Sequence, residues 1–141
     1  MFDQPIKNVM ERNSLLIAPP ETSVSNAARL MAAQNVGAVI IVENDHVTGI
    51  FTERDAVFRV IAQERDPHAT KLRDVMTVSP KVLASDKSYG HALVLMQENG
   101  FRHVPVIDDG RLVGVVTSRN AMDPDLEEFI SEERRREYLQ R

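Results

Sequence analysis

Two short polar segments of the sequence combine residue types that bind phosphate and ribose. They are Thr52-Glu53-Arg54-Asp55 and Thr117-Ser118-Arg119-Asn120, and each follows an apolar run that starts with glycine. A threonine hydroxyl can donate to phosphate, an arginine can bind phosphate through two N–H groups, and the Asp55 carboxylate can accept from both ribose hydroxyls. If each segment begins a helix, free backbone N–H groups and the helix dipole add to this attraction. The sequence therefore predicts an anion site at each segment.

The same pattern also has a structural interpretation. Thr-x-x-Asp is close to a capping box, in which the threonine caps a helix and the acidic side chain reaches back to the cap. Both roles can coexist in different ligation states. The second segment has Asn120 in place of Asp55. An amide binds a diol less strongly, because hydrogen bonds to charged groups contribute about 1.5 to 3 kcal/mol against about 1 kcal/mol for neutral ones.

The two segments belong to an internal repeat with an offset of 65 residues. Nine of the 41 positions from Ile17 to Val57 recur 65 residues later, and Val9-Met10 recurs as Val75-Met76. Self-similarity of this kind indicates two copies of one structural unit. The identical pairs are Ser23 and Ser88, Ala27 and Ala92, Leu30 and Leu95, Met31 and Met96, Val39 and Val104, Gly49 and Gly114, Thr52 and Thr117, Arg54 and Arg119, and Ala56 and Ala121.

Each copy has the pattern of a β-α-β-β-α unit, which predicts an α+β fold. Apolar residues three and four apart predict a helix that Thr22 or Ser23 can cap, and in the second copy a helix over 89–96 that Gly100 ends. Short β-branched runs predict one hairpin over 38–51 and another over 104–116. Leading strands are expected at 15–17 and 82–83, and a second helix from each threonine of the polar segments. Because neither copy buries much core alone, we expect sheet-against-sheet packing with pseudo-two-fold symmetry and matching clefts.

The repeat also sets the expected domain boundaries. The first repeat with its N-terminal segment takes residues 1–66, a polar linker 67–71, and the second repeat 72–122. Residues 123–141 form a tail in which Leu126, Phe129 and Ile130 have the spacing of one helix face. This tail is expected to be a helix that folds back on its own module or contacts a partner.

Arg102 and His103 occupy the positions that Gly37 and Ala38 hold in the first copy. Two interpretations are open: a solvated strand end, or two phosphate ligands that project into the cleft. His103 is the one of these whose charge could change near neutral pH. Gly37 would leave room for an adenine ring or a second nucleotide moiety. One larger cleft and one more cationic cleft are therefore expected.

The repeat resembles a tandem pair of cystathionine β-synthase (CBS) domains, a Bateman module of the stand-alone signal-transduction type. The resemblance rests on Val-Met at 9–10 and 75–76, Ala-x-x-x-Met at 27–31 and 92–96, Val104-Pro105-Val106, and the segments 49–55 and 114–120. It implies a regulatory homodimer whose clefts bind an adenosine-containing ligand such as AMP, ADP, ATP, NAD or S-adenosylmethionine. The expected ligand-binding residues are Ile17, Gly37, Ala38, Val39, Thr52, Arg54, Asp55, Val78, Arg102, His103, Val104, Pro105, Thr117, Arg119 and Asn120.

Composition and motifs argue against other classes. A net charge of −4 gives no broad footprint for nucleic acid, and the absence of cysteine removes thiolate chemistry and Cys-based metal sites. No apolar run approaches the roughly 18 residues of a membrane span, and no signal peptide is recognisable. There is no P-loop, no G-x-G-x-x-G and no pairing of nucleophile and base. We therefore expect a cytoplasmic protein that is not an enzyme and requires no metal.

Two functional hypotheses follow. The first is an adenine-nucleotide sensor in which ligand binding changes repeat packing or dimer contacts, and a partner protein regulated in trans reads the change. The second is a structural oligomerisation module with vestigial ligand clefts. Binding of a nucleotide would separate them, because a ligand of the native state raises its stability.

Overall fold

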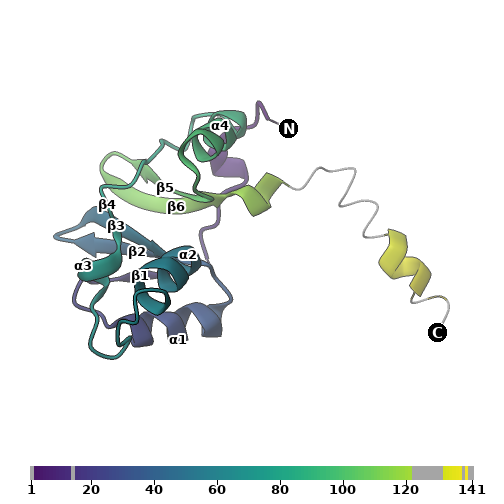
Figure 1. Ribbon diagram of the computed structural model, residues 1–141. Coiled ribbons are helices and arrows are strands. Elements are labelled where there is room, and N and C mark those ends of the chain that lie inside the picture. The colour runs from purple at the N-terminus through teal and green to yellow at the C-terminus, as the bar shows by residue number, and fades with distance from the viewer. Residues whose placement is uncertain (1, 14, 122–131, 138, 140–141) are drawn as a thin grey trace.

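The computed structural model describes residues 2–13, 15–121, 132–137 and 139. Within these residues two β-sheets face each other, and helices cover the outer face of each sheet (Figure 1). The expected α+β fold with two repeats is confirmed. Residues 132–137 are helical, in agreement with the expected C-terminal helix. The apolar positions Leu126, Phe129 and Ile130 of that tail lie outside the described residues.

The first repeat contains the complete β-α-β-β-α unit. Its elements are β1 (Ile17–Ala18), α1 (Val24–Gln34), β2 (Ala38–Glu43), β3 (His46–Thr52), α2 (Glu53–Asp55) and its π-helical continuation η2 (Ala56–Ile61). β1 runs parallel to β2, and β2 and β3 form an antiparallel hairpin. Of the two possible caps, Thr22 and Ser23, it is Ser23 that caps α1, because its hydroxyl accepts the Asn26 N–H at 3.1 Å. Asn35 ends the helix in the left-handed conformation.

The second repeat follows the same order with a shorter leading strand. Its elements are α4 (Tyr89–Asn99), β5 (His103–Asp108), β6 (Arg111–Thr117) and the 3-10 turn η3 (Ser118–Ala121). Ser88 caps α4, and Gly100 ends it with a φ of +71°. The leading strand is reduced to a single parallel bridge between Leu83 and Val106. Of the second helix expected from Thr117, the structure describes only the turn η3, and the residues that follow Ala121 lie outside the described part of the chain.

Each repeat is completed by a segment that precedes the other repeat. The edge strand beside β3 is β4 (Thr77–Val78), which follows α3 (Leu72–Val75). The matching edge of β6 is occupied by Glu11, just after η1 (Ile6–Asn8). Glu11 N–H donates to the Val115 carbonyl at 2.8 Å, and Val115 N–H donates to the Glu11 carbonyl at 3.0 Å. The two edge segments are thus exchanged between the repeats.

The hydrophobic cores show the same exchange. Ile6 is fully buried in the core of the second repeat, whereas Leu72 and Val75 are buried in the core of the first. The domain boundaries expected at 66/67 and 71/72 assign each repeat one continuous stretch of the chain. Packing instead groups the segment around Ile6 with the second repeat and the segment around Leu72 with the first.

Two glycines allow the exchanged segments to lie directly on the hairpins. A Cβ atom built on Gly114 would lie 2.8 Å from both Met10 Sδ and the Glu11 carbonyl oxygen. One built on Gly49 would lie 2.9 Å from Met76 Cγ. Because a backbone oxygen in a close-packed interior cannot move aside easily, position 114 requires glycine, whereas a side chain at position 49 would have to displace the Met76 side chain. The same contact between a glycine and a methionine is therefore present in both repeats, between Gly114 and Met10 and between Gly49 and Met76.

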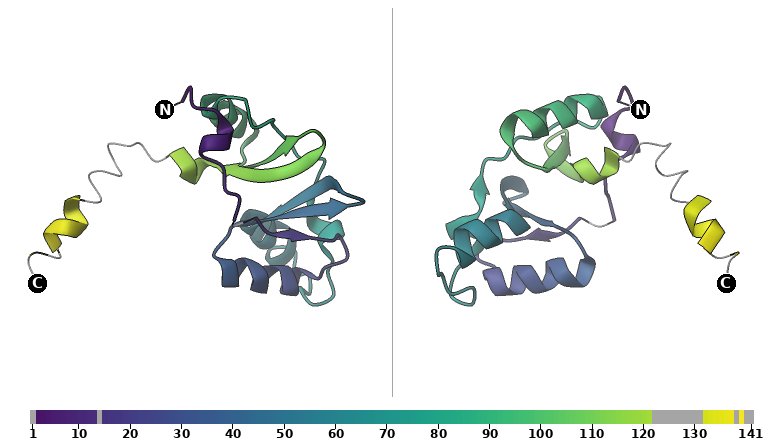
Figure 2. Two further views of the ribbon diagram at one scale, coloured as in Figure 1. Left: turned by 180° about the vertical axis from the view of Figure 1, so that it is seen from behind. Right: turned by 45° about the vertical axis from the view of Figure 1, so that its right-hand side comes forward.

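The two sheets pack against each other, as expected from the sequence. Ala38 and Ile40 of β2, Ile50 of β3 and Val115 of β6 form a buried cluster between them. Figure 2 shows the layers from behind, with α4 and α1 on opposite outer faces and the two sheets inside. This arrangement brings the starts of β2 and β5 together at the centre of the molecule.

Candidate functional site

A cavity of about 160 Å³ lies between the repeats, where the starts of β2 and β5 meet the end of β6. Both repeats contribute to its wall, as the predicted cleft between the copies requires. A more open hollow of about 290 Å³ shares five lining residues with it. The cavity is lined by six of the predicted site residues, namely Gly37, Ala38, Arg102, His103, Thr117 and Arg119.

The positive charge of this cavity comes from its arginines. Burial lowers the pKa of His103 below its usual 6.5, and Arg119 and Arg102 lower it further, while the nearby Glu53 carboxylate opposes this effect. His103 is therefore mainly neutral at pH 7. Its charge change lies at more acidic pH than its ordinary value predicts. At neutral pH, Arg102 and Arg119 are the cationic groups available to an anion.

Glu53 is a lining residue that sequence reasoning missed. A Cβ atom built on Gly37 would lie 3.1 Å from Glu53 Oε1 and 3.4 Å from His103 Nε2. Gly37 thus leaves open the space between these two side chains, which supports its predicted role of making room. A signal was present in the sequence, because the equivalent residue of the second copy is the uncharged Ser118.

Thr52 and Asp55 form the capping box that was the alternative interpretation of their pattern. Asp55 Oδ2 accepts the Thr52 N–H at 2.9 Å, and the Asp55 N–H donates to Thr52 Oγ1 at 3.3 Å. Asp55 also forms an ion pair of 3.5 Å with Arg59. Neither residue lines the two hollows found within the described part of the chain. Their ribose and phosphate roles stay predictions.

Arg54 lies outside both hollows as well. Its guanidinium lies 5.0 Å from the centre of the Phe58 ring, which is a cation–π geometry. The predicted phosphate contact of Arg54 stays a prediction. Arg119, its counterpart in the second repeat, does line the cavity.

The remaining predicted ligand residues lie in other places. Val39 and Val104 are fully buried in the cores of their repeats, and Pro105 is also buried. Ile17 on β1 and Val78 on β4 expose 49% and 64% of their surface. None of these five residues lines either of the described hollows. The side chain of Asn120 lies outside the part of the chain that the structure describes.

The similarity of this chain to known proteins agrees with this architecture. The model of the CBS domain matches residues 6–62 and again residues 72–124. The chain belongs to the CBS domain family. An uncharacterized protein of Methanopyrus kandleri is 35% identical to it over 132 residues, which cover 91% of this chain and 67% of the relative. Other curated relatives are longer, since the chain spans between 12% and 53% of them.

Solved structures also resemble this CBS pair. A conserved protein of Pyrococcus horikoshii has a TM-score of 0.78 at 30% identity, covering 85% of this chain and 90% of that one. Another CBS domain pair was solved in complex with 5′-methylthioadenosine and S-adenosyl-L-methionine. It has a TM-score of 0.74 at 26% identity, covering 83% of this chain and 95% of that chain.

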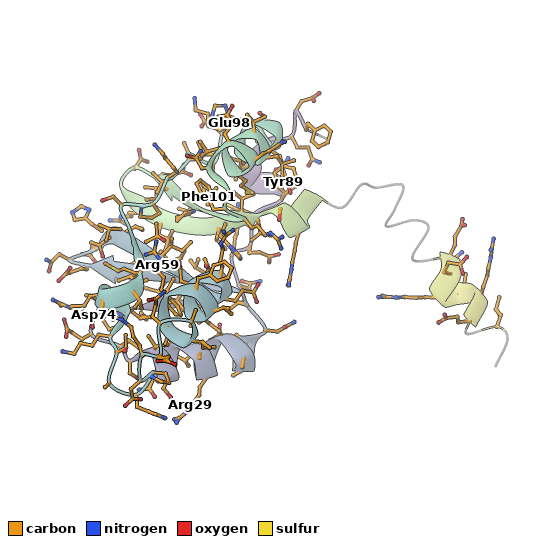
Figure 3. All side chains as sticks on the ribbon, in the orientation of Figure 1. Arg29, Arg59, Asp74, Tyr89, Glu98 and Phe101 are labelled. Atoms are coloured by element: carbon orange, nitrogen blue, oxygen red, sulfur yellow. The ribbon has the colours of Figure 1, made fainter. Side chains whose placement is uncertain are left out.

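An arginine links the capping box of the first CBS repeat to the exchanged segment. Arg59 N–H groups donate to the carbonyl oxygens of Val75 at 3.3 Å and Met76 at 3.1 Å, and the same guanidinium pairs with Asp55. Figure 3 shows Arg59 in the half of the molecule that contains α3. Asp55 is therefore in contact, through one side chain, with the segment that completes the sheet.

The described residues of this CBS pair contain no group of three or more His, Cys, Asp or Glu side chains that could hold a metal ion. Within the same residues, no helix has the length and apolar character needed to cross a membrane.

Proposed function

We propose that this CBS pair is a regulatory module that binds an adenine nucleotide of the AMP, ADP, ATP or NAD type between its repeats. The observation that carries the proposal is a cavity walled by both repeats, with Arg102 and Arg119 available to a phosphate. The adenosine compounds bound to a structurally similar CBS pair support the same ligand class.

Regulation would follow from the position of the cavity. A ligand bound there touches the starts of β2 and β5 together, so it contacts both repeats at once. It can change their packing only through different affinities for two arrangements of the repeats. A second copy of the chain, or a partner protein regulated in trans, would then read the changed surface.

Arg102→Ala is expected to weaken AMP binding by about fivefold at low salt, because an exposed charge pair contributes up to about 1 kcal/mol. Adenosine has no phosphate and should bind both proteins equally. Calorimetry of the parent, Arg102→Ala and the control Arg111→Ala measures this. Arg111 is exposed at the β5–β6 turn and does not line the cavity.

Equal AMP affinity in the parent and Arg102→Ala would mean that Arg102 is a solvated residue at a strand end and does not bind phosphate. A thermal-shift panel of AMP, ADP, ATP, NAD and S-adenosylmethionine tests the function itself. If none of these raises the melting temperature, the structural oligomerisation module becomes the better hypothesis.

Asp55→Asn is expected to raise the Kd for ribonucleotides by about 5- to 30-fold, because the amide has one acceptor atom where the carboxylate has two. For this, Asp55 must release its bonds to Thr52 and Arg59 and turn to the ribose. The 2′-deoxy and 3′-deoxy nucleotides should bind the parent less well, and the variant should discriminate less between them and the ribonucleotide. Calorimetry showing unchanged affinity for every nucleotide would leave helix capping as the role of Asp55.

We also propose that the module is a homodimer through its flanking helices. Phe58 and Ile61 on the α2–η2 helix expose 53% and 69% of their surface, and Leu30 on α1 exposes 41%. Clustered exposed apolar side chains are typical of interaction surfaces. Light scattering is expected to give twice the 15.9 kDa of one chain for the parent. The variant Ile61→Glu is expected to have the mass of a single chain. A parent mass of 15.9 kDa at micromolar concentration would contradict the dimer.

A further inference from the structure

The cavity between the repeats carries negative as well as positive groups. Its described lining includes Arg102 and Arg119, and also Glu11 and Glu53. The formal charges of these four side chains cancel, and burial keeps His103 mainly neutral at pH 7. The lining therefore offers no excess of positive charge to compensate a chain of phosphates.

Glu53 contributes to this lining from the start of α2. As the first residue of α2 it is held by its backbone, since its N–H donates to the Gly37 carbonyl at 3.1 Å. Its carboxylate and the His103 imidazole face each other across Gly37, where a Cβ atom would meet Oε1 at 3.1 Å and Nε2 at 3.4 Å. A ligand that entered the space above Gly37 would therefore touch this carboxylate.

We propose that Glu53 determines which adenosine ligand the cavity accepts, favouring zwitterionic compounds over polyphosphates. A carboxylate attracts a sulfonium or ammonium group and repels a phosphate, while Arg102 and Arg119 can hold the carboxylate of the same ligand. Selectivity of this kind comes from a repulsive contact with the wrong ligand as much as from an attractive one with the right ligand. The inference rests on the proposed function, a cavity for an adenosine-containing ligand between the repeats, but it replaces phosphorylated nucleotides as the preferred ligands with adenosine compounds that carry both charges.

The test is calorimetry of the full chain with S-adenosylmethionine, with ATP free of magnesium, and with adenosine. The variants are Glu53→Gln and the control Glu43→Gln, whose carboxylate is exposed at the other end of β2. The parent should bind S-adenosylmethionine more tightly than ATP. Because Glu53 is exposed on one side, its removal should weaken S-adenosylmethionine by about fivefold and strengthen ATP by about fivefold. Glu43→Gln should change neither.

Adenosine reports any damage to the cavity that is common to all ligands. The deciding quantity is therefore the ratio of the two charged ligands' affinities, in which common damage cancels. A ratio that shifts toward ATP by about 25-fold in Glu53→Gln supports the inference. A parent that prefers ATP, or a ratio unchanged by the substitution, overturns it while leaving nucleotide binding intact. If none of the three compounds binds the parent, the inference is overturned, and if AMP, ADP and NAD also fail to bind, the proposed function itself fails.

Discussion

Tyr89→Ala is expected to lower the free energy of unfolding by about 3 to 5 kcal/mol, the range for removal of a buried aromatic ring. Tyr89 is fully buried at the first turn of α4, in the same core as Ile6. Its hydroxyl donates to the Thr117 carbonyl at 2.9 Å, next to the cavity. Figure 3 places it between α4 and the sheet of β5 and β6. Urea denaturation followed by circular dichroism measures the loss.

Tyr89→Phe separates the ring from its hydroxyl. It should cost only about 1 kcal/mol near neutral pH, since one hydrogen bond is lost and the ring stays. Burial raises the pKa of Tyr89 to about 12. Above the unfolded value near 10, the unfolded chain releases this proton and the folded chain keeps it, so the stability of the parent falls as pH rises.

Between pH 10 and 12 this fall should amount to about 2 to 3 kcal/mol, and Tyr89→Phe should lack that part of it. Titration of the other tyrosine and the lysines is common to both proteins and cancels in the comparison. The same alkaline loss of stability in parent and variant would show that the hydroxyl of Tyr89 is not protected by burial.

Ile6→Ala is expected to lower the free energy of unfolding by about 2 to 5 kcal/mol, although residue 6 lies near one end of the chain. Ile6 has no exposed surface, and its backbone N–H donates to the Lys87 carbonyl at 2.8 Å. Its substitution opens a cavity in the core of the second repeat. Lys7→Ala is the matched control, because that exposed neighbour should change stability by less than about 0.5 kcal/mol.

The reciprocal substitution Leu72→Ala should cost a similar amount through the core of the first repeat. Urea denaturation of the three variants measures these values. A loss below about 0.5 kcal/mol for Ile6→Ala would contradict the exchange of the edge segments, because a terminal segment that frays carries no such burial.

Local features of the fold could be predicted because their signals are local. Ser23 and Ser88 mark the starts of the two long helices by their capping chemistry, and Gly100 marks an end by its left-handed backbone. The hairpins follow from β-branched runs separated by turn residues. The exchange of edge segments could not be predicted in this way. An apolar pattern shows that Ile6 and Leu72 are buried, but it does not show in which of two similar cores.

The candidate site was predicted in part for the same reason. Arg102 and His103 differ from their counterparts in the first copy, and that difference pointed to the cavity they line. Asp55 could be a cap or a ribose ligand by its sequence, and only the bonds to Thr52 and Arg59 show the cap. Glu53 was missed because a capping box assigns roles only to its first and fourth residues, Thr52 and Asp55, and Glu53 lies between them.

The exchanged edge segments have a consequence for synthesis on the ribosome. The segment around Ile6 leaves the ribosome well before β6, which ends at Thr117 and is part of the surface that this segment binds. The first repeat likewise lacks its edge strand until Val78 has emerged. Neither repeat can therefore complete its own sheet before part of the other has been made. The nascent chain must carry the exposed apolar segment around Ile6 until β6 has been made, in a fold whose decisive contacts are distant in sequence and slow to form.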